Sequence, residues 1–292
     1  MTLSEFFLSY PLLLVAFSVV FGLMVGSFLN VVIYRLPIMM EAEWTQQCSE
    51  LLEIENPSKI DGSKSKFNLA VPNSHCPKCK HEISVLENIP VFSWLLQGGK
   101  CRHCQEPISS RYPIIETITA IITALVVQQS GFTWLTITLL LLAWSLIALT
   151  MIDFDHQLLP DDITLPLLWL GLGVNSLGLI TSLQDALWGA IAGYGILWTV
   201  YWLFKLATGK DGMGYGDFKL LAALGAWMGW QALPIIILLS SLVGAAVGLS
   251  LIVIKGRDKN IPIPFGPYLA SAGFLTLLWG EQITTFYYRL IL

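Results

Sequence analysis

Two aspartates lie at the ends of long apolar stretches, where a charged group is costly and is therefore expected to have a function. Asp153 directly follows the apolar residues 133–152, and Asp217 follows the Gly-Tyr-Gly triplet 214–216 at the start of another apolar stretch. Two carboxyl groups held close together share a proton. One of them can then draw a proton from water while the other donates to a carbonyl oxygen. The pair thus has the chemistry of an aspartic protease.

Each acidic residue also has a structural interpretation. Asp153 could be a solvated helix end, and Asp217 could be an N-cap that accepts hydrogen bonds from the first N–H groups of a helix. Turn and cap roles are expected for the acids around Pro160, which are Asp155, Asp161 and Asp162. We expect Glu116 to bond to a neighbouring helix or to Arg111.

Four cysteines form two Cys-x-x-Cys pairs, Cys76 with Cys79 and Cys101 with Cys104. Each pair places two thiolates on one tight turn, and two such turns facing each other make the tetrahedral sulfur site that Zn²⁺ prefers. Four sulfurs leave no position for a substrate, so we expect a structural metal. Two redox dithiols are the alternative. The fifth cysteine, Cys48, is expected to have no role in the site.

The composition indicates that membrane helices position these groups. The chain has 292 residues, of which 55% are hydrophobic and 12% charged, whereas soluble proteins average about 25% charged residues. This balance excludes an ordinary soluble enzyme, a disordered protein and a nucleic-acid-binding protein. A helix needs about 20 apolar residues to cross a bilayer. The predicted spans are residues 11–34, 114–129, 133–152, 163–180, 183–204, 218–230, 233–254 and 267–288.

Half of the charged residues lie between Arg35 and Arg111. We therefore predict an all-α polytopic membrane protein of about eight transmembrane helices, with a small zinc-binding insertion between the first two. The predicted parts are a first helix (1–34), the insertion (35–113) and a seven-helix membrane domain (114–292). Residues 48–65 are polar and are predicted to be a flexible part of the insertion.

The positions of the basic residues predict the orientation, because cytoplasmic loops carry an excess of Lys and Arg. With the N-terminus outside, the insertion and the turns 153–162, 205–217 and 255–265 all face the cytoplasm. Every Lys and Arg except Arg289 then lies in or beside a cytoplasmic segment. Gly-x-x-x-Gly spacings at 22/26, 189/193, 225/229 and 244/248 are expected to allow close helix packing.

Four motifs in this order resemble those of the type IV prepilin peptidases, the bifunctional leader peptidase/N-methyltransferases of pilus and type II secretion systems. The resemblance extends over nearly the whole chain. Its segments are Gly26–Pro37 (GSFLNVVIYRLP), the two cysteine pairs, Ile152–Asp161 (IDFDHQLLPD) and Gly214–Lys219 (GYGDFK). The last resembles the GxGD segment shared with presenilin-like proteases.

The resemblance implies an enzyme of the bacterial inner membrane that cleaves prepilins or pseudopilins after a Gly, on the cytoplasmic side. The leader removed is short and basic, and the new N-terminal residue, commonly Phe, is then methylated with S-adenosylmethionine. Asp153 and Asp217 match the catalytic pair of the family. Asp155 and Asp161 compete with Asp153 for the first position. The resemblance identifies no residue that contacts the methyl donor, and the oligomeric state stays open.

Two functions of other classes are compatible with parts of the pattern. A transporter also uses intramembrane acids and broken helices, but it would place them near the midplane in two repeats, and no repeat is visible in this sequence. A non-catalytic assembly subunit would explain the cysteines but would leave Asp153 and Asp217 without a role. A short distance between the two carboxyls would favour the peptidase.

Overall fold

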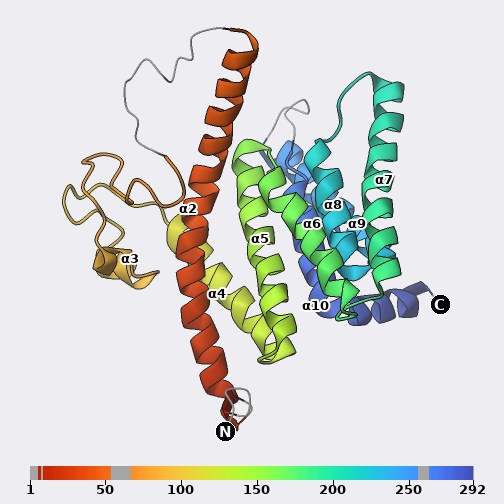
Figure 1. The fold of residues 1–292 in the computed structure, drawn as a ribbon, viewed down its shortest axis with the longest axis horizontal. Helices are drawn as coiled ribbons and strands as arrows, with labels where there is room; N and C mark the ends of the chain where they lie inside the picture. Colours follow the sequence, from red (N-terminus) through yellow and green to blue (C-terminus); the bar gives the residue numbers. More distant parts are fainter. Residues whose placement is uncertain (1–5, 8, 54–66, 256–262, 292) are drawn as a thin grey trace. The chain divides into compact units, whose positions relative to one another are not determined.

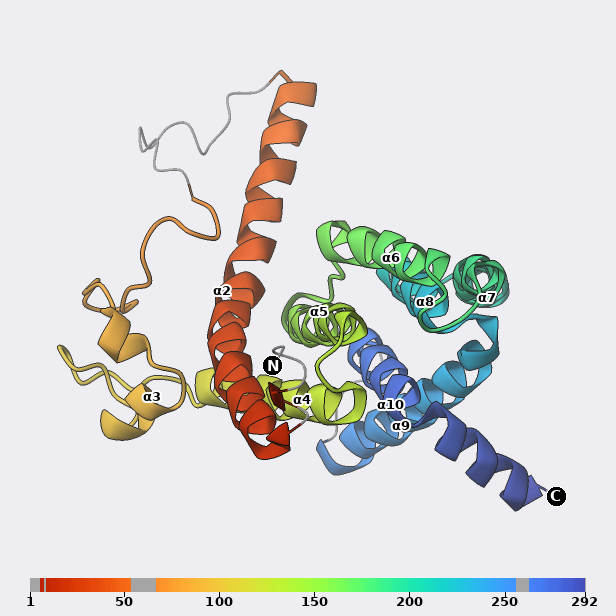
Figure 2. The same cartoon turned by 60° about the horizontal axis from the view of Figure 1, so that its bottom comes forward.

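The structure, a computed structural model, describes residues 6–7, 9–53, 67–255 and 263–291, and in these residues it is helical with no strand. Figures 1 and 2 show the arrangement of the helices. The long helices are α2 (Pro11–Leu51), α4 (Arg111–Ser130), α5 (Trp134–His156), α6 (Asp161–Ser176), α7 (Leu183–Thr208), α8 (Tyr215–Met228), α9 (Leu233–Lys255) and α10 (Gly266–Ile291). The predicted all-α fold with about eight long helices is confirmed.

Five segments of the described chain are long and apolar enough to cross a bilayer by themselves. They are α2, α4, α5, α7 and Trp230–Leu251, which joins the 3₁₀ helix η3 (Trp230–Ala232) to most of α9. The other long helices depart from this simple form. Helices α6 and α8 have 16 and 14 residues, and α10 contains a break at Trp279, whose φ and ψ of −132° and 22° are not helical.

The chain forms two compact units, Met1–Thr136 and Ile137–Leu292. Helix α4 therefore packs with α2 in the first unit. The division predicted from the sequence, at residues 34 and 113, concerns which segments lie in water and stays a prediction.

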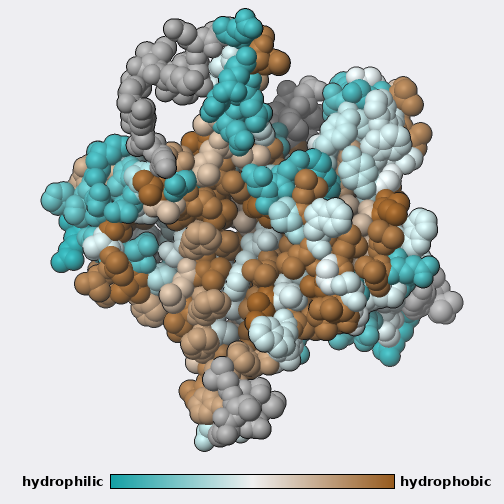
Figure 3. Space-filling view, viewed as in Figure 1, coloured by the Kyte–Doolittle hydropathy of each residue, from teal (hydrophilic) through white to brown (hydrophobic). Residues whose placement is uncertain are grey.

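In the first unit, α2 and α4 pack closely through glycines of α2. A β-carbon at Gly22 would lie 2.7 Å from the Cα of Ala120, and one at Gly26 would lie 2.6 Å from the Cα of Glu116. These distances are shorter than any side chain allows, so the spacing of the two glycines does serve helix packing. Beyond this contact, the N-terminal part of α2 exposes apolar side chains such as Leu12 and Phe17 (Figure 3), as a lipid-facing helix does.

Helix α2 is longer than the sequence predicts. It continues past Tyr34 and Pro37 to Leu51, so Cys48 and the three residues after it are helical rather than flexible. Most of residues 38–51 are Met, Glu, Ala, Gln and Leu, which have high helix propensity. Of the other residues in this predicted flexible segment, 52 and 53 follow the helix, and 54–65 lie outside the described residues.

In the second unit, α8 lies between α6 and α7 (Figures 1 and 2) and is buried from Phe218 to Trp227 apart from Lys219. Gly189 of α7 and Gly225 of α8 meet directly, because a β-carbon on either would lie 2.2 Å from the carbonyl oxygen of the other. A helix surrounded by protein on most sides need not match the bilayer thickness. This burial explains how a helix as short as α8 is accommodated.

The buried side chain of Asn175 caps the C-terminal end of α8. The Asn175 side-chain amide donates to the carbonyl oxygens of Ala226 and Trp227 at 2.8 and 2.9 Å. Its oxygen accepts from the backbone N–H groups of Ile180 and Thr181. The last carbonyls of a helix have no partner within the helix, so Asn175 satisfies groups that would otherwise be buried unpaired.

Candidate active site and metal centre

Asp153 is held in place by the start of another helix. It lies in the last turn of α5 and is only 5% exposed. The backbone N–H of Gly266, the first residue of α10, donates to Oδ2 of Asp153 at 2.9 Å. A β-carbon at Gly266 would lie 2.6 Å from that oxygen. Position 266 therefore requires glycine for the helix N-terminus to approach the carboxylate this closely.

Asp217 lies in the first turn of α8, three residues after the N-cap residue Gly214. Its side chain is 7% exposed and accepts a hydrogen bond from the backbone N–H of Gly214. An acidic residue at this position that reaches back to the N-cap N–H stabilises the helix start. The other oxygen, Oδ1, is buried and has no hydrogen-bond partner among the described residues. That oxygen is thus free to bind a water molecule or a substrate group.

Leu159 connects the helix starts that hold the two acids. A β-carbon at Gly216 would lie 2.7 Å from Cβ of Leu159, and one at Gly266 would lie 3.1 Å from Cδ2 of the same side chain. Leu159 itself is buried. The two glycines let α8 and α10 close on one leucine of the α5–α6 turn, and the carboxylates of Asp153 and Asp217 are then near enough to interact electrostatically.

The other acids of this region lie outside the pair. Asp155, Asp161 and Asp162 are exposed. Asp161, in the first turn of α6, accepts hydrogen bonds at 2.7 Å from Nζ of Lys219 through both of its oxygens. The structure therefore brings together Asp153 and Asp217, and it places Asp161 in an ion pair that links α6 to α8.

A second polar cluster holds the loop that leads into α8. The hydroxyl of Tyr201 donates a hydrogen bond to Asp211 at 2.6 Å, and Asp211 forms an ion pair with Lys205 at 2.8 Å. The contact with Lys205 has the larger effect and that with Tyr201 the smaller, and together they hold the pKa of the Asp211 carboxyl below its usual range. The ring of Tyr201 also lies 5.4 Å from that of Tyr215. The cluster thus ties the end of α7 to both the loop and the start of α8.

The metal centre lies in the first unit. The Sγ atoms of Cys76, Cys79, Cys101 and Cys104 all lie within 4.8 Å of one another and could hold a metal ion. The Cys76–Cys104 and Cys79–Cys101 sulfur distances are 3.7 and 4.0 Å. A tetrahedral site with Zn–S bonds of about 2.3 Å has edges of about 3.8 Å. The donor atoms and their spacing therefore suit a zinc ion.

The two cysteine turns have the same backbone structure. In the first, Cys76 N–H donates to the carbonyl of His81, and in the second Cys101 N–H donates to the carbonyl of Glu106. Lys80 and Gln105, the residues after the second cysteine of each pair, both have a positive φ, of 58° and 60°. The same cysteine turn therefore occurs twice, 25 residues apart, and the thiols of the two turns lie close together.

The thiols differ in how readily they ionise. Backbone N–H groups of Cys79 and Lys78 lower the pKa of the Cys76 thiol to about 6. The backbone N–H of Glu106 favours the thiolate of Cys104, but partial burial and the neighbouring sulfurs together raise its pKa to about 12. Four adjacent thiolates repel one another, so a bound cation is what would make the complete set stable.

Two buried polar residues attach the insertion to the membrane helices. The guanidinium of Arg35, in α2, donates to the carbonyl oxygens of Asn68 and Pro72 at 2.9 and 2.6 Å. Glu116, in α4, accepts a hydrogen bond at 2.7 Å from the backbone N–H of Val91. The carboxylate of Glu116 also accepts a hydrogen bond from the side chain of Ser27 in α2. The prediction that Glu116 bonds to a neighbouring helix is therefore confirmed, and its contact with Val91 of the insertion is an addition to that prediction.

Sequence reasoning missed Gly266 and Leu159. The available signal for Gly266 was the Phe-Gly-Pro sequence at 265–267, since Gly followed by Pro is typical of a helix start. No local pattern relates it to Asp153, which lies 113 residues earlier.

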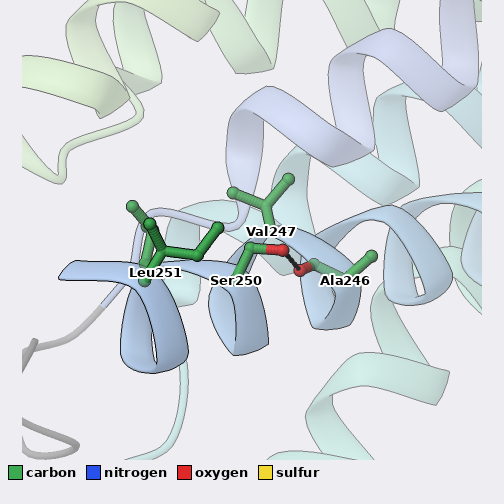
Figure 4. A pocket seen from close by; sticks show the side chains of 5 residues that line it. Ala246, Val247, Ser250 and Leu251 are labelled. Atoms are coloured by element: carbon green, nitrogen blue, oxygen red, sulfur yellow. Dashed lines mark hydrogen bonds between the residues drawn. The ribbon is translucent and has the colours of Figure 1, made fainter. Parts of the chain in front are cut away.

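A hollow on α9 is a poor candidate for catalysis. It is lined by four aliphatic side chains and Ser250, whose hydroxyl donates to the carbonyl of Ala246 in its own helix at 2.7 Å (Figure 4). No titratable side chain lines it.

Comparisons with known proteins cover both units. A family model described as the bacterial peptidase A24 N-terminal domain matches residues 20–130, and that of the type IV leader peptidase family matches residues 140–249. A protein of Stutzerimonas stutzeri named prepilin leader peptidase/N-methyltransferase is 56% identical over 98% of both chains. Proteins of the same name from Pseudomonas aeruginosa and Aeromonas hydrophila are 54% and 56% identical, over 98% and 95% of this chain and 98% and 94% of theirs. No solved structure matches.

Proposed function

Because this chain belongs to the type IV leader peptidase family, we propose that it is a multi-pass bacterial membrane enzyme that cleaves prepilins and pseudopilins and then methylates the new N-terminus. The observation that carries the peptidase assignment is the buried acid pair, Asp153 and Asp217, each held by one backbone N–H group. The relatives' name, shared over nearly the full length, supports both activities.

The two carboxyls act as a general acid and a general base. With one proton between them, the ionised member takes a proton from water as the water oxygen adds to the scissile carbonyl carbon. The protonated member donates to the carbonyl oxygen. The tetrahedral intermediate then collapses, the carbon–nitrogen bond breaks, and the amine leaves with a proton from the pair. The free Oδ1 of Asp217 gives this chemistry an oxygen that no described residue already occupies.

Gly214 has a role in this mechanism. It directly precedes the first turn of α8, and a β-carbon there would come no closer than 3.7 Å to Oδ2 of Asp217. The absence of a side chain at Gly214 lets an extended substrate backbone come close to the acid pair. The cut is expected after a Gly at the end of the short basic leader, on the cytoplasmic side.

The second activity transfers a methyl group to the amine that cleavage exposes. S-adenosylmethionine supplies the methyl: its sulfur–carbon bond breaks as the nitrogen–carbon bond forms, and the amine loses a proton. We assign this activity to the first unit, which contains the N-terminal motif Gly26–Pro37 and the insertion, the segments with which the family resemblance associates it. Cys76, Cys79, Cys101 and Cys104 would hold a structural Zn²⁺, which keeps the insertion folded.

The proposed location is the bacterial inner membrane, with the N-terminus in the periplasm. In this orientation the insertion and the α7–α8 loop face the cytoplasm, where the positive-inside rule puts their Lys and Arg residues, and the α5–α6 turn lies on the same side. Reducing conditions there also keep the cysteines available for metal.

The test is a cleavage and methylation assay on a model prepilin, with and without S-adenosylmethionine. Asp153→Asn and Asp217→Asn are expected to abolish leader cleavage while leaving the protein folded in the membrane. The matched control is Asp162→Asn, which changes an exposed acid of the same region and should cleave normally. Normal cleavage by purified Asp217→Asn would show that the assignment of this residue is wrong.

The same variants separate the two activities. Both Asp→Asn variants should still methylate a substrate supplied already cleaved. If they lose both activities with the fold intact, one shared site would replace the two-site proposal.

A further inference from the structure

An apolar patch covers one side of the insertion. It is formed by the 3₁₀ helix η2 (Val85–Asn88) and the short helix α3 (Phe92–Leu96), which contact each other. The most exposed of its side chains are those of Val85, Leu86 and Leu96, at 87%, 76% and 88%. The η2–α3 patch consists of Val85, Leu86, Ile89, Phe92, Leu95 and Leu96. A contiguous apolar surface of this kind marks an interaction site.

The opposite side of α3 is already packed. The indole N–H of Trp94 donates to the carbonyl of Ile108 at 3.1 Å, and a β-carbon at Gly99 would lie 2.9 Å from the Trp94 ring. Helix α3 therefore rests on the second cysteine turn through Trp94. Phe92, Leu95 and Leu96 of the same helix take no part in these contacts and are exposed.

The depth of α3 relative to the membrane follows from Glu116. Its carboxylate accepts the N–H of Val91, the residue just before α3. Glu116 lies five residues into the membrane-spanning helix α4, or about 7.5 Å along its axis. The start of α3 is thus level with the second turn of α4, and Figure 1 shows α3 beside the region where α2 and α4 cross.

The surroundings at this depth are apolar. Ile114, Ile118 and Ile121 of α4 are spaced on one helix face, and all are exposed. Exposed isoleucines on a spanning helix face hydrocarbon. Because the first two bracket Glu116 in the helix, the hydrocarbon region reaches the level at which Glu116 binds the insertion. Figure 3 shows apolar side chains at the position of α3, next to the hydrophilic surface of the rest of the insertion.

We propose that the η2–α3 patch is embedded in the cytoplasmic leaflet and anchors the metal-binding insertion to the lipid bilayer. An amphipathic segment with one apolar face lies in the plane of the interface rather than crossing it. The five residues of α3 are too few to span. The anchor holds the insertion against the membrane surface, and this arrangement does not depend on which reactions the enzyme catalyses.

The test measures the environment of single positions in the full-length, metal-loaded protein in phospholipid vesicles. Nitroxide labels are placed at Leu86→Cys and Leu96→Cys in a Cys48→Ser background, since Cys48 is exposed and lies outside the metal cluster. Ile118→Cys of α4 provides the lipid reference. Gln47→Cys, on the exposed end of α2, provides the water reference. Collision with dissolved oxygen and with a water-soluble nickel chelate is measured for each label.

The proposal predicts that both patch labels collide more with oxygen than with the nickel chelate, as the Ile118 label does. Labels that behave like the Gln47 label would overturn it, because the patch would then lie in water. Labels shielded from both reagents would also overturn it, in favour of a protein partner or a second copy of the chain. Metal content equal to that of the parent protein confirms folding, and Val85→Cys and Leu95→Cys replace any variant that loses metal.

Discussion

Gly266 is the residue on which the position of Asp153 depends most directly. Its N–H holds the carboxylate at 2.9 Å, and a β-carbon would lie 2.6 Å from the same oxygen. We expect Gly266→Ala to displace the acid and lower the cleavage rate by on the order of 100-fold, as small misplacements of catalytic groups do. Steady-state cleavage of a model prepilin measures this effect.

The control for Gly266→Ala is Gly173→Ala in α6, where a β-carbon would meet no atom within 4 Å. This variant should cleave at the normal rate. Equal rates for the two alanine variants would contradict the role given to the Gly266 N–H. Methylation of a pre-cleaved substrate should be unchanged in both, since Gly266 lies in the second unit.

The residues of the site differ in how far the sequence predicts them. Asp153 and Asp217 were identifiable because charges are rare at the edges of apolar stretches, and the four cysteines because their spacing is that of a metal site. Gly266 and Leu159 were not, because their contacts join segments distant in the chain and no local pattern encodes them. Their roles require the packed helices.

At the scale of elements, the loop between α7 and α8 is held by charge. Lys205 and Tyr201 hold the pKa of the Asp211 carboxyl below its usual range. A lowered pKa means that the ionised group stabilises the folded state above the ordinary Asp pKa. This stabilisation is lost as the pH falls through the lowered value.

We therefore expect Asp211→Asn to melt at a lower temperature than the wild type at pH 7. The difference should shrink as the pH falls through the ordinary Asp pKa and vanish below the lowered one, where the wild-type side chain is also neutral. Melting temperatures of the two detergent-solubilised proteins across this range test the point. A difference that stays constant with pH would show that the loop is not held by the ionised carboxylate.

The contact between α7 and α8 depends on the absence of side chains. Gly225→Ala would put a β-carbon 2.2 Å from the carbonyl oxygen of Gly189, so the helices must separate. Overpacking of this kind costs about 1–3 kcal/mol, and we expect thermal stability and cleavage to fall together because α8 carries Asp217. Gly195→Ala in α7 is the matched control, since its β-carbon would meet nothing within 4 Å. Unchanged stability of Gly225→Ala would contradict the close packing.

The elements themselves were predicted with uneven success. Apolar length identified the eight long helices, because a bilayer imposes that length on most of them. It misjudged the end of α2, since Arg35 and Pro37 interrupt the apolar stretch and residues 41–50 are mostly polar, although most of residues 38–51 have high helix propensity. It also could not show the break at Trp279 in α10. Hydropathy reports the environment of a helix rather than its backbone geometry.

At the scale of the whole molecule, the two proposed chemistries lie in different compact units. The metal cluster is in Met1–Thr136 and the acid pair in Ile137–Leu292. The two matched family models also fall on separate stretches, 20–130 and 140–249. Because the cluster's bonds stay within its own unit, damage to it should affect the fold of that unit first.

We expect Cys76→Ser to lose bound zinc and most methylation of a pre-cleaved substrate, while leader cleavage falls much less. The reason is that a bound metal would join the two cysteine turns through the thiols of both, whereas the contacts of Asp153 and Asp217 lie in the other unit. Cys48→Ser is the matched control, since Cys48 lies in α2 outside the cluster, and it should retain both zinc and methylation. Zinc per chain, by elemental analysis, is measured together with both activities. Unchanged zinc in Cys76→Ser would refute the site, and complete loss of cleavage with the membrane helices intact would show that the units do not function separately.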